Sequence, residues 1–401
     1  MQNRAMSPIK RDSVNKWLEL THDSGNVGMY RFTKGGNATL LSSCFSLFIQ
    51  ELLDQTQLIT TTEQEKWVLY LKERQDSRTG LFQDPMLKAT DLKDDLHSAV
   101  YLEWQMTMFG ISALDVFGEQ PKYNLKFLNK FRGKELLQAW LADRDLSNPW
   151  MMSNEIMFLM FFFSYEYIQI NMRESLELLE IIFNYLDQHI DSKTGLWGTN
   201  YGANTHNAMA GAYHFYPFYA YFKRSIMYPE NVIDRVLALQ NRCDGLFLAK
   251  GGGGACEDLD AIYILTTLGR RTGYRKEDIL IALSKAEQGI IQNQNADGGF
   301  SWAKFVRYGI KEWYYALNPI IPNMDWRTIF VLKKSAIGSR IKRTKSLSHA
   351  GWDKMTFDIE ESDMWSTYFR LFALSLIDEY RSNTGENQWK YRSIPGIGWF
   401  K

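Results

Sequence analysis

Gln294-Asn-Ala-Asp-Gly-Gly-Phe300 is the stretch that decides the fold, because the chain repeats its pattern. Related phrases run from Gln75 to Phe82, from Asp191 to Trp197 and from Gln240 to Phe247. Each phrase closes a polar stretch with Asp and Gly, which tolerate the left-handed backbone of a helix end or turn, and then places an aromatic residue. A short loop and a much more apolar segment follow. The phrases therefore indicate repeats of a polar helix, a turn and an apolar helix.

The apolar segments return at intervals of roughly 50–60 residues, as in arrays of helical hairpins. They begin near Asn37, Asp95, Pro149, Asn204, Cys256, Asn323 and Ser362. The amphipathic segments between them, with apolar residues at helical spacing, are Thr62–Gln75, Leu125–Asp143, Arg173–His189, Asn231–Asn241 and Lys276–Asn293. A ring of apolar inner helices inside a sheath of amphipathic outer helices buries both sets. No comparable set of strand-like runs is present. We therefore expect an all-α fold, an α/α toroid of about six helical hairpins.

The toroid is expected to form one domain over residues 1–401, since closed repeat barrels of this length fold as a unit. Residues 1–30 are interpreted as an N-terminal extension. Residues 340–361, which open with the basic phrase Arg340-Ile-Lys-Arg-Thr-Lys-Ser, are interpreted as a surface excursion.

Charge and cysteine content exclude several classes of protein. Lys plus Arg and Asp plus Glu are both 46, so no net field draws the chain to nucleic acid. Three cysteines are too few for a disulfide framework, and the N-terminus has no secretory pattern, which favours the cytoplasm. The longest apolar run, Ile156–Phe163, is far below the ~20 residues needed to span a bilayer. Peripheral contact with a membrane stays open, and nothing in the sequence indicates the oligomeric state.

The polar residues at the starts of the inner helices should converge on one mouth of the ring. The most informative start follows the loop Gly251–Gly254, where Glu257, Asp258 and Asp260 fall in a first helical turn that stabilises negative charge. These three acids and His206, whose residue type titrates nearest neutral pH, are the candidate catalytic residues. The candidate substrate-binding residues are His97, Trp197, Asn207, Tyr213, His214, Asp363, Trp365 and Arg370. For any single member, a helix cap or a surface polar residue is the more ordinary explanation, and for the histidines a core or cavity-wall position is.

No metal or cofactor is expected. His206 and His214 stand eight residues apart and no Cys-x-x-Cys pair accompanies them, which disfavours a zinc site. The glycine run lacks the spacing of a phosphate-binding loop, and no Gly-x-Ser-x-Gly elbow of a serine hydrolase occurs.

The phrase Gln294–Phe300 resembles the Gln-x-x-x-Gly-x-Trp/Phe repeat of the terpenoid cyclase and protein prenyltransferase superfamily. The copies at Gln75 and Gln240 carry one extra residue before the glycine. The resemblance implies the toroid. In the class II cyclases it further implies an Asp-x-Asp-Asp motif that protonates an isoprenoid inside an aromatic cavity. Asp258-Leu-Asp260-Ala261 is the nearest match and lacks the final acid.

Three functions stay open at this stage. The first is a terpenoid cyclase-like biosynthetic enzyme, an isomerase or lyase, whose acid cluster protonates an isoprenoid or similar small molecule between aromatic faces. The second is a carbohydrate-active α/α-barrel lyase or hydrolase, which pairs two acids, or a Tyr and a His, beside aromatic rings. The third is a non-catalytic binding or assembly protein. Aromatic rings below an acid cluster would favour the cyclase, and many polar groups around an open groove would favour sugar.

Overall fold

The computed structural model describes residues 11–92, 98–247, 252–304, 326–341, 345–382 and 389–400. Within these ranges the regular secondary structure is helical except for one antiparallel hairpin, in which β1 (Ser346–Ser348) pairs with β2 (Thr356–Asp358), and isolated bridges. The predicted all-α class is confirmed.

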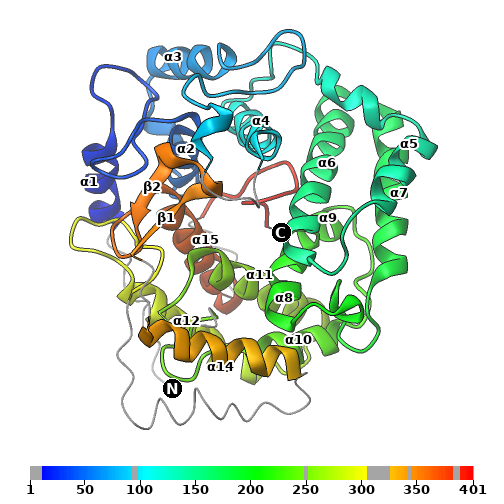
Figure 1. The fold of residues 1–401 in the computed structure, drawn as a ribbon. Coiled ribbons are helices and arrows are strands. Elements are labelled where there is room, and N and C mark those ends of the chain that lie inside the picture. The colour runs from blue at the N-terminus through cyan, green and yellow to red at the C-terminus, as the bar shows by residue number, and fades with distance from the viewer. Residues whose placement is uncertain are drawn as a thin grey trace.

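The inner wall is a closed ring of apolar helices. Its members among the described residues are α2 (Leu40–Leu52), α4 (Ala99–Val116), α6 (Pro149–Ile170), α8 (Thr205–Tyr213), α11 (Ala255–Thr272) and α15 (Met364–Arg381). Each packs against the next in this order, and α15 returns to α2, so the ring closes (Figure 1). Most residues of α6 are buried, which explains why this helix is apolar on all sides.

A second set of helices sheathes the ring. Each of these outer helices precedes an inner helix along the chain: α1 (Arg11–Thr21), α3 (Thr61–Lys72), α5 (Lys134–Ala142), α7 (Arg173–His189), α10 (Pro229–Leu239) and α12 (Lys276–Gln292). On α7 the buried residues, from Leu178 to Leu186, recur every three or four positions, and acids occupy much of the opposite face. The fold is therefore an α/α toroid, as predicted.

Shorter elements connect these pairs. The helix α9 (Tyr216–Tyr221) continues α8 after a break. The single-turn elements are η1 (Thr56–Leu58), η2 (Ala89–Asp91), η3 (Lys126–Phe131), η4 (Thr199–Tyr201), η5 (His349–Gly351) and η6 (Asp353–Met355).

One predicted inner helix is wrong. The segment expected to begin near Asn323, which itself lies outside the described residues, forms α14 (Trp326–Ile341) on the outside of the ring. The ring closes without it, because α11 packs directly against α15. Trp326 and Phe330 are 70% and 59% exposed, so much of the apolar content of α14 faces solvent instead of the core.

The repeated turn phrases have a common physical basis. The side-chain amide of the leading glutamine donates to the carbonyl of the glycine, with distances of 2.9 Å for Gln75 and Gly80 and 2.7 Å for Gln240 and Gly245. Gln294 makes the same bond to Gly298 at 3.0 Å. These glycines have positive φ angles of 82°, 74° and 97°, which L side chains rarely adopt.

In the three phrases that begin with glutamine, the backbone N–H of the aromatic residue bonds to the next inner helix. Phe82 donates to the hydroxyl of Thr107 on α4 at 2.9 Å, and Phe300 donates to the hydroxyl of Thr367 on α15 at 2.9 Å. Phe247 donates to the carboxylate of Asp258 on α11 at 2.7 Å.

The two ends of the ring differ. At the end where the inner helices begin, the hairpin β1–β2 packs inward and buries His349 and Trp352. At the other end, residues 389–400 follow the ends of the inner helices: Lys390 N donates to Leu52 O, and the Trp389 indole donates to Asp378. The tail then enters the centre of the ring (Figure 1). The single-domain boundaries and the interpretation of residues 1–30 and 340–361 stay predictions.

Candidate functional site

The first turns of α11 point their carboxyl groups in different directions. Gly254 precedes the helix in extended conformation, and Glu257, Asp258 and Asp260 follow it. Residues two positions apart on an α-helix point about 200° apart, so Asp258 and Asp260 face nearly opposite sides. Only one of the two can face the middle of the ring.

Asp258 faces the turn that precedes α11. Its Oδ1 accepts from Phe247 N at 2.7 Å, and its Oδ2 accepts from Gly254 N at 3.1 Å and from Arg370 at 3.1 Å. The ion pair is fully buried on both sides. Burial raises the pKa of Asp258 to about 6, and Arg370 and the Phe247 amide oppose that rise. Because three donors point at this carboxylate, we assign Asp258 to holding the structure together.

The guanidinium of Arg370 is likewise held by contacts within the protein. Its Nε donates to Ser301 O at 2.8 Å, and a terminal nitrogen donates to Trp302 O. The predicted substrate contact therefore links α15, α11 and the turn after Phe300. Asp258 and Thr367 each lie four residues after the N-cap of their helix. Each accepts a hydrogen bond from the backbone N–H of the aromatic residue that ends the preceding turn phrase, so the repeat indicates a structural role for this position.

Asp260 faces the other way. It shares one face of α11 with Cys256 and Tyr263, at spacings of four and three residues. The side chain is 3% exposed and makes no hydrogen bond or ion pair within the described part of the chain. Burial raises the pKa of Asp260 well above its ordinary value, and the nearby charges of Glu257 and Asp258 raise it further. Burial thus favours the protonated form of Asp260.

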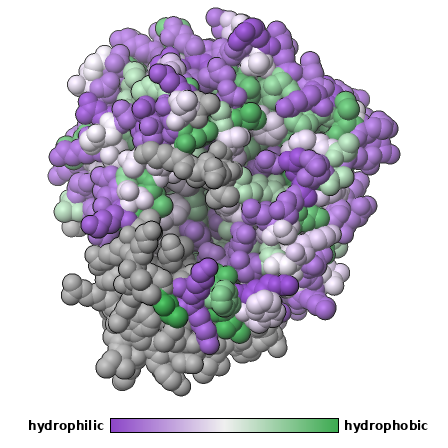
Figure 2. Space-filling model, viewed as in Figure 1, coloured by the Kyte–Doolittle hydropathy of each residue, from purple (hydrophilic) through white to green (hydrophobic). Residues whose placement is uncertain are grey.

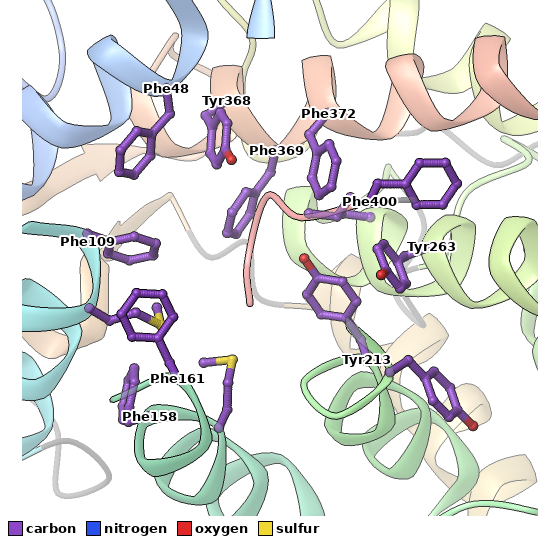
Figure 3. Packing of buried hydrophobic residues seen from close by; sticks show 14 of the residues in the cluster. Phe48, Phe109, Phe158, Phe161, Tyr213, Tyr263, Tyr368, Phe369, Phe372 and Phe400 are labelled. Atoms are coloured by element: carbon purple, nitrogen blue, oxygen red, sulfur yellow. The ribbon is translucent and has the colours of Figure 1, made fainter. Parts of the chain in front are cut away.

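Tyr213 on α8 lies close to this acid. Its hydroxyl is buried and finds no hydrogen-bond partner among the described residues. Burial, followed by the charge of Asp260, raises the pKa of Tyr213 well above its ordinary value. Its ring meets that of Tyr263 at 5.1 Å, and Figure 3 shows both side chains toward the centre of the ring with Phe369, Phe372 and Phe400 nearby. Asp260 and Tyr213 are the two predicted residues that the fold brings together there.

The two histidines lie at different depths. Half-buried His206 places Nε2 at 2.9 Å from Phe247 O, so that nitrogen carries the hydrogen, and burial lowers the pKa of the ring. His214 places Nδ1 at 2.8 Å from the Ser153 hydroxyl, and burial lowers its pKa to about 3. His214 therefore joins α8 to α6 as a neutral core residue. Asn207 is half-buried beside His206.

The remaining predicted residues are placed as follows. Trp197 is 1% exposed, donates to Leu186 O at 2.8 Å and packs its ring against Phe215. It has no free face, so we leave it out of the proposed site. Asp363 is the N-cap of α15, accepting from Ser366 N at 2.7 Å, and burial raises its pKa to about 7. Trp365 is half-buried with its ring 4.2 Å from that of His349. His97 lies outside the described residues.

A pocket at the start of α4 and α6 was missed by the sequence reasoning. It encloses about 300 Å³ where α4 and α6 begin and is lined by Ser98, Val100, Tyr101, Trp104, Lys130, Phe131, Trp140, Arg144, Glu155 and Phe158. Arg144 pairs with Glu155 and lies 4.3 Å from the Trp140 ring. Lys130 Nζ lies 4.9 Å from the Phe131 ring. The spacing Trp140-x-x-x-Arg144 on a helix is the one signal that the sequence offered for it.

In the described ranges, no three His, Cys, Asp or Glu side chains gather as a metal site would require. None of the helices placed in the structure combines the length and the apolar character needed to cross a bilayer.

No protein-family model matches the sequence, and a search of curated proteins finds no match. Among solved structures, a polysaccharide lyase aligns over 84% of this chain and 98% of its own, at 13% identity and a TM-score of 0.42. The GH76A α-1,6-mannanase from Salegentibacter sp. HEL1_6 aligns over 81% of this chain and 98% of its own, at 11% identity and a TM-score of 0.39. Likeness of this degree assigns no activity. Both of these structures are named as carbohydrate-active enzymes. Neither is a terpenoid cyclase, so the comparisons do not support that resemblance.

Proposed function

We propose that this protein is a carbohydrate-active hydrolase in which Asp260 donates the proton to the leaving sugar. The observation that carries the proposal is the state of Asp260: buried, without a described partner, and next to a second carboxyl group on the same helix. Glycoside hydrolysis needs such a pair, one carboxylic acid with a raised pKa and one carboxylate. Asp260 and Glu257, three residues apart on α11, supply it.

The proposed step balances as a hydrolysis. The proton of Asp260 passes to the glycosidic oxygen as the bond from that oxygen to the anomeric carbon breaks. Glu257 takes a proton from the water that adds to the anomeric carbon, and a later exchange with solvent restores both groups. Tyr213 is a positioning residue, because its hydroxyl, free of described partners, can orient a substrate oxygen beside Asp260. His206, Asn207 and Trp365 remain candidates for the wall of the mouth.

The pocket at the start of α4 and α6 supports sugar as the substrate class. It combines indole and phenyl groups with a guanidinium, an ammonium and a carboxylate, a mixture that suits a ring with one apolar face and several hydroxyls. We take it as a candidate site for a sugar unit.

The cyclase remains the second candidate because of one observation. Phe109, Phe161, Phe369 and Phe372 surround the centre of the ring, as a carbocation would require (Figure 3). Asp258 argues against the cyclase. In a cyclase it would belong to the acidic motif that donates the proton, but here it forms a buried ion pair with Arg370.

The test is hydrolysis of neutral and acidic oligosaccharides, with isoprenoid substrates in parallel, by wild type, Asp260→Asn and Glu257→Gln. We expect new reducing ends from at least one sugar, and losses of a hundredfold or more in both variants without a fall in melting temperature. The matched control is Glu277→Gln, an exposed acid in the first turn of outer helix α12. If the products instead absorbed in the ultraviolet, as unsaturated sugars do, the enzyme would be a lyase and not a hydrolase. Full activity of Asp260→Asn would remove the proposed donor.

A further inference from the structure

The segment from Trp326 to Lys345 has a charge unlike that of the rest of the chain. It contains seven basic residues and no acidic one, in a protein whose charges balance overall. The basic residues are Arg327, Lys333, Lys334, Arg340, Lys342, Arg343 and Lys345. Helix α14 provides sixteen residues of this segment and stands outside the inner ring.

The outward face of α14 carries both large apolar and basic side chains. Trp326, Phe330 and Ile337 are 70%, 59% and 46% exposed, and their spacings of four and seven residues align them along one side of the helix. Lys333 falls in the same line, between Phe330 and Ile337, and exposed Lys334 flanks it. In the position of α14, Figure 2 shows hydrophobic and hydrophilic residues side by side at the surface.

The opposite face of α14 is anchored. Thr328 is fully buried, and its hydroxyl accepts from Thr205 N, at the start of inner helix α8, at 2.8 Å. The contact fixes the exposed face away from the toroid. It also places α14 at the mouth, since α8 begins at that end.

We propose that α14 docks the protein on an anionic membrane surface. An interfacial helix needs aromatic and aliphatic side chains that enter the lipid headgroup region and lysines that reach the phosphates, and α14 has both on one face. Because the chain as a whole has no net charge, the local cluster of basic residues is what would attract the protein to anionic lipids. A nucleic acid would use the cations but would leave Ile337 without a partner. Docking through α14 turns the mouth of the ring toward the lipid.

The experiment is co-sedimentation of the full chain with vesicles of phosphatidylcholine, alone and with about one third phosphatidylglycerol. We expect binding to the anionic vesicles only, weakening as salt rises from about 0.05 to 0.5 M. Lys333→Gln with Lys334→Gln should lower the partition about twentyfold, and Trp326→Ser with Phe330→Ser at least tenfold. All four side chains lie on the exposed side of the helix, so melting temperatures should stay unchanged.

The matched control is Leu58→Ser with Lys134→Gln, which changes an exposed leucine and an exposed lysine on other elements and should bind as wild type does. Three outcomes would overturn the proposal: no binding to anionic vesicles, equal loss in the control, or tighter binding to a polynucleotide that the Trp326 and Phe330 changes leave intact.

Discussion

The assignment of Asp258 to structure and Asp260 to chemistry predicts opposite results from the same substitution at the two positions. In Asp258→Asn the side chain keeps one oxygen for Phe247 N. The new amide nitrogen then faces two donors, Gly254 N–H and Arg370, and Arg370 is left buried without its counterion. Breaking a buried pair in this way costs about 3–5 kcal/mol.

The size of the expected shift in melting temperature follows from the length of the chain. With about 2.1 cal/mol/K of unfolding entropy per residue, 401 residues give roughly 0.8 kcal/mol/K, so Tm should fall by about 4–6 °C. Asp260→Asn removes no described hydrogen bond and takes away the cost of burying an acid, so its Tm should equal or exceed that of wild type. Differential scanning calorimetry measures both.

A double variant tests the cause. Asp258→Asn with Arg370→Gln removes both charges, so its loss should be smaller than the two single losses together by about 1–3 kcal/mol. The reasoning is refuted if Asp258→Asn melts with wild type while Asp260→Asn unfolds early, or if the double variant shows simple additivity.

Three further predictions concern other parts of the molecule. Between the ordinary Asp pKa and the raised pKa of Asp260 the native state binds one proton more than the unfolded chain, so this group lowers stability by up to ~1.4 kcal/mol per pH unit as pH rises. Urea titrations at about pH 5 and pH 8 should therefore show Asp260→Asn losing less stability than wild type over that interval. Gly298→Ala should destabilise by about 2–3 kcal/mol in the same assay, because φ is +97° and a Cβ would stand 1.9 Å from Ser13 O. Gly35→Ala, with nothing within 4 Å, should be neutral, and the reverse order would contradict the turn geometry. Lys130→Ala should weaken binding of an acidic oligosaccharide about fivefold, measured by calorimetry. Lys134→Ala is the control, and an equal effect in both variants would show that Lys130 does not bind the ligand.

The repeat pattern predicted the toroid because both of its signals are local. A glutamine, a glycine and an aromatic residue close each turn through bonds within a few residues, and helical periodicity marks the buried faces. The same local signal was misleading at α14, where apolar residues at helical spacing face outward. Hydrophobicity alone does not say whether a helix has a partner.

The candidate site was less predictable, because the roles of neighbouring acids depend on contacts distant in sequence. Asp258 and Asp260 look alike in the sequence, and only the arrival of Arg370 from 112 residues away separates them. The hydrogen bond of His214 to Ser153 and the packing of Trp197 likewise come from other repeats. The pocket around Trp140 joins η3, α4, α5 and α6, and no single stretch of sequence encodes it.

The C-terminal tail gives the ring a direction. Trp389, Lys390 and Ser393 bond to the last turns of α15, α2 and α4, and Phe400 packs against Tyr263 at 5.7 Å inside the ring. The tail therefore lies in the centre of the ring at the end opposite the starts of the inner helices (Figure 1). Under the proposed hydrolase function, a sugar chain would enter from the end opposite the tail and reach Asp260 by its tip, which favours trimming from chain ends over cuts in the middle.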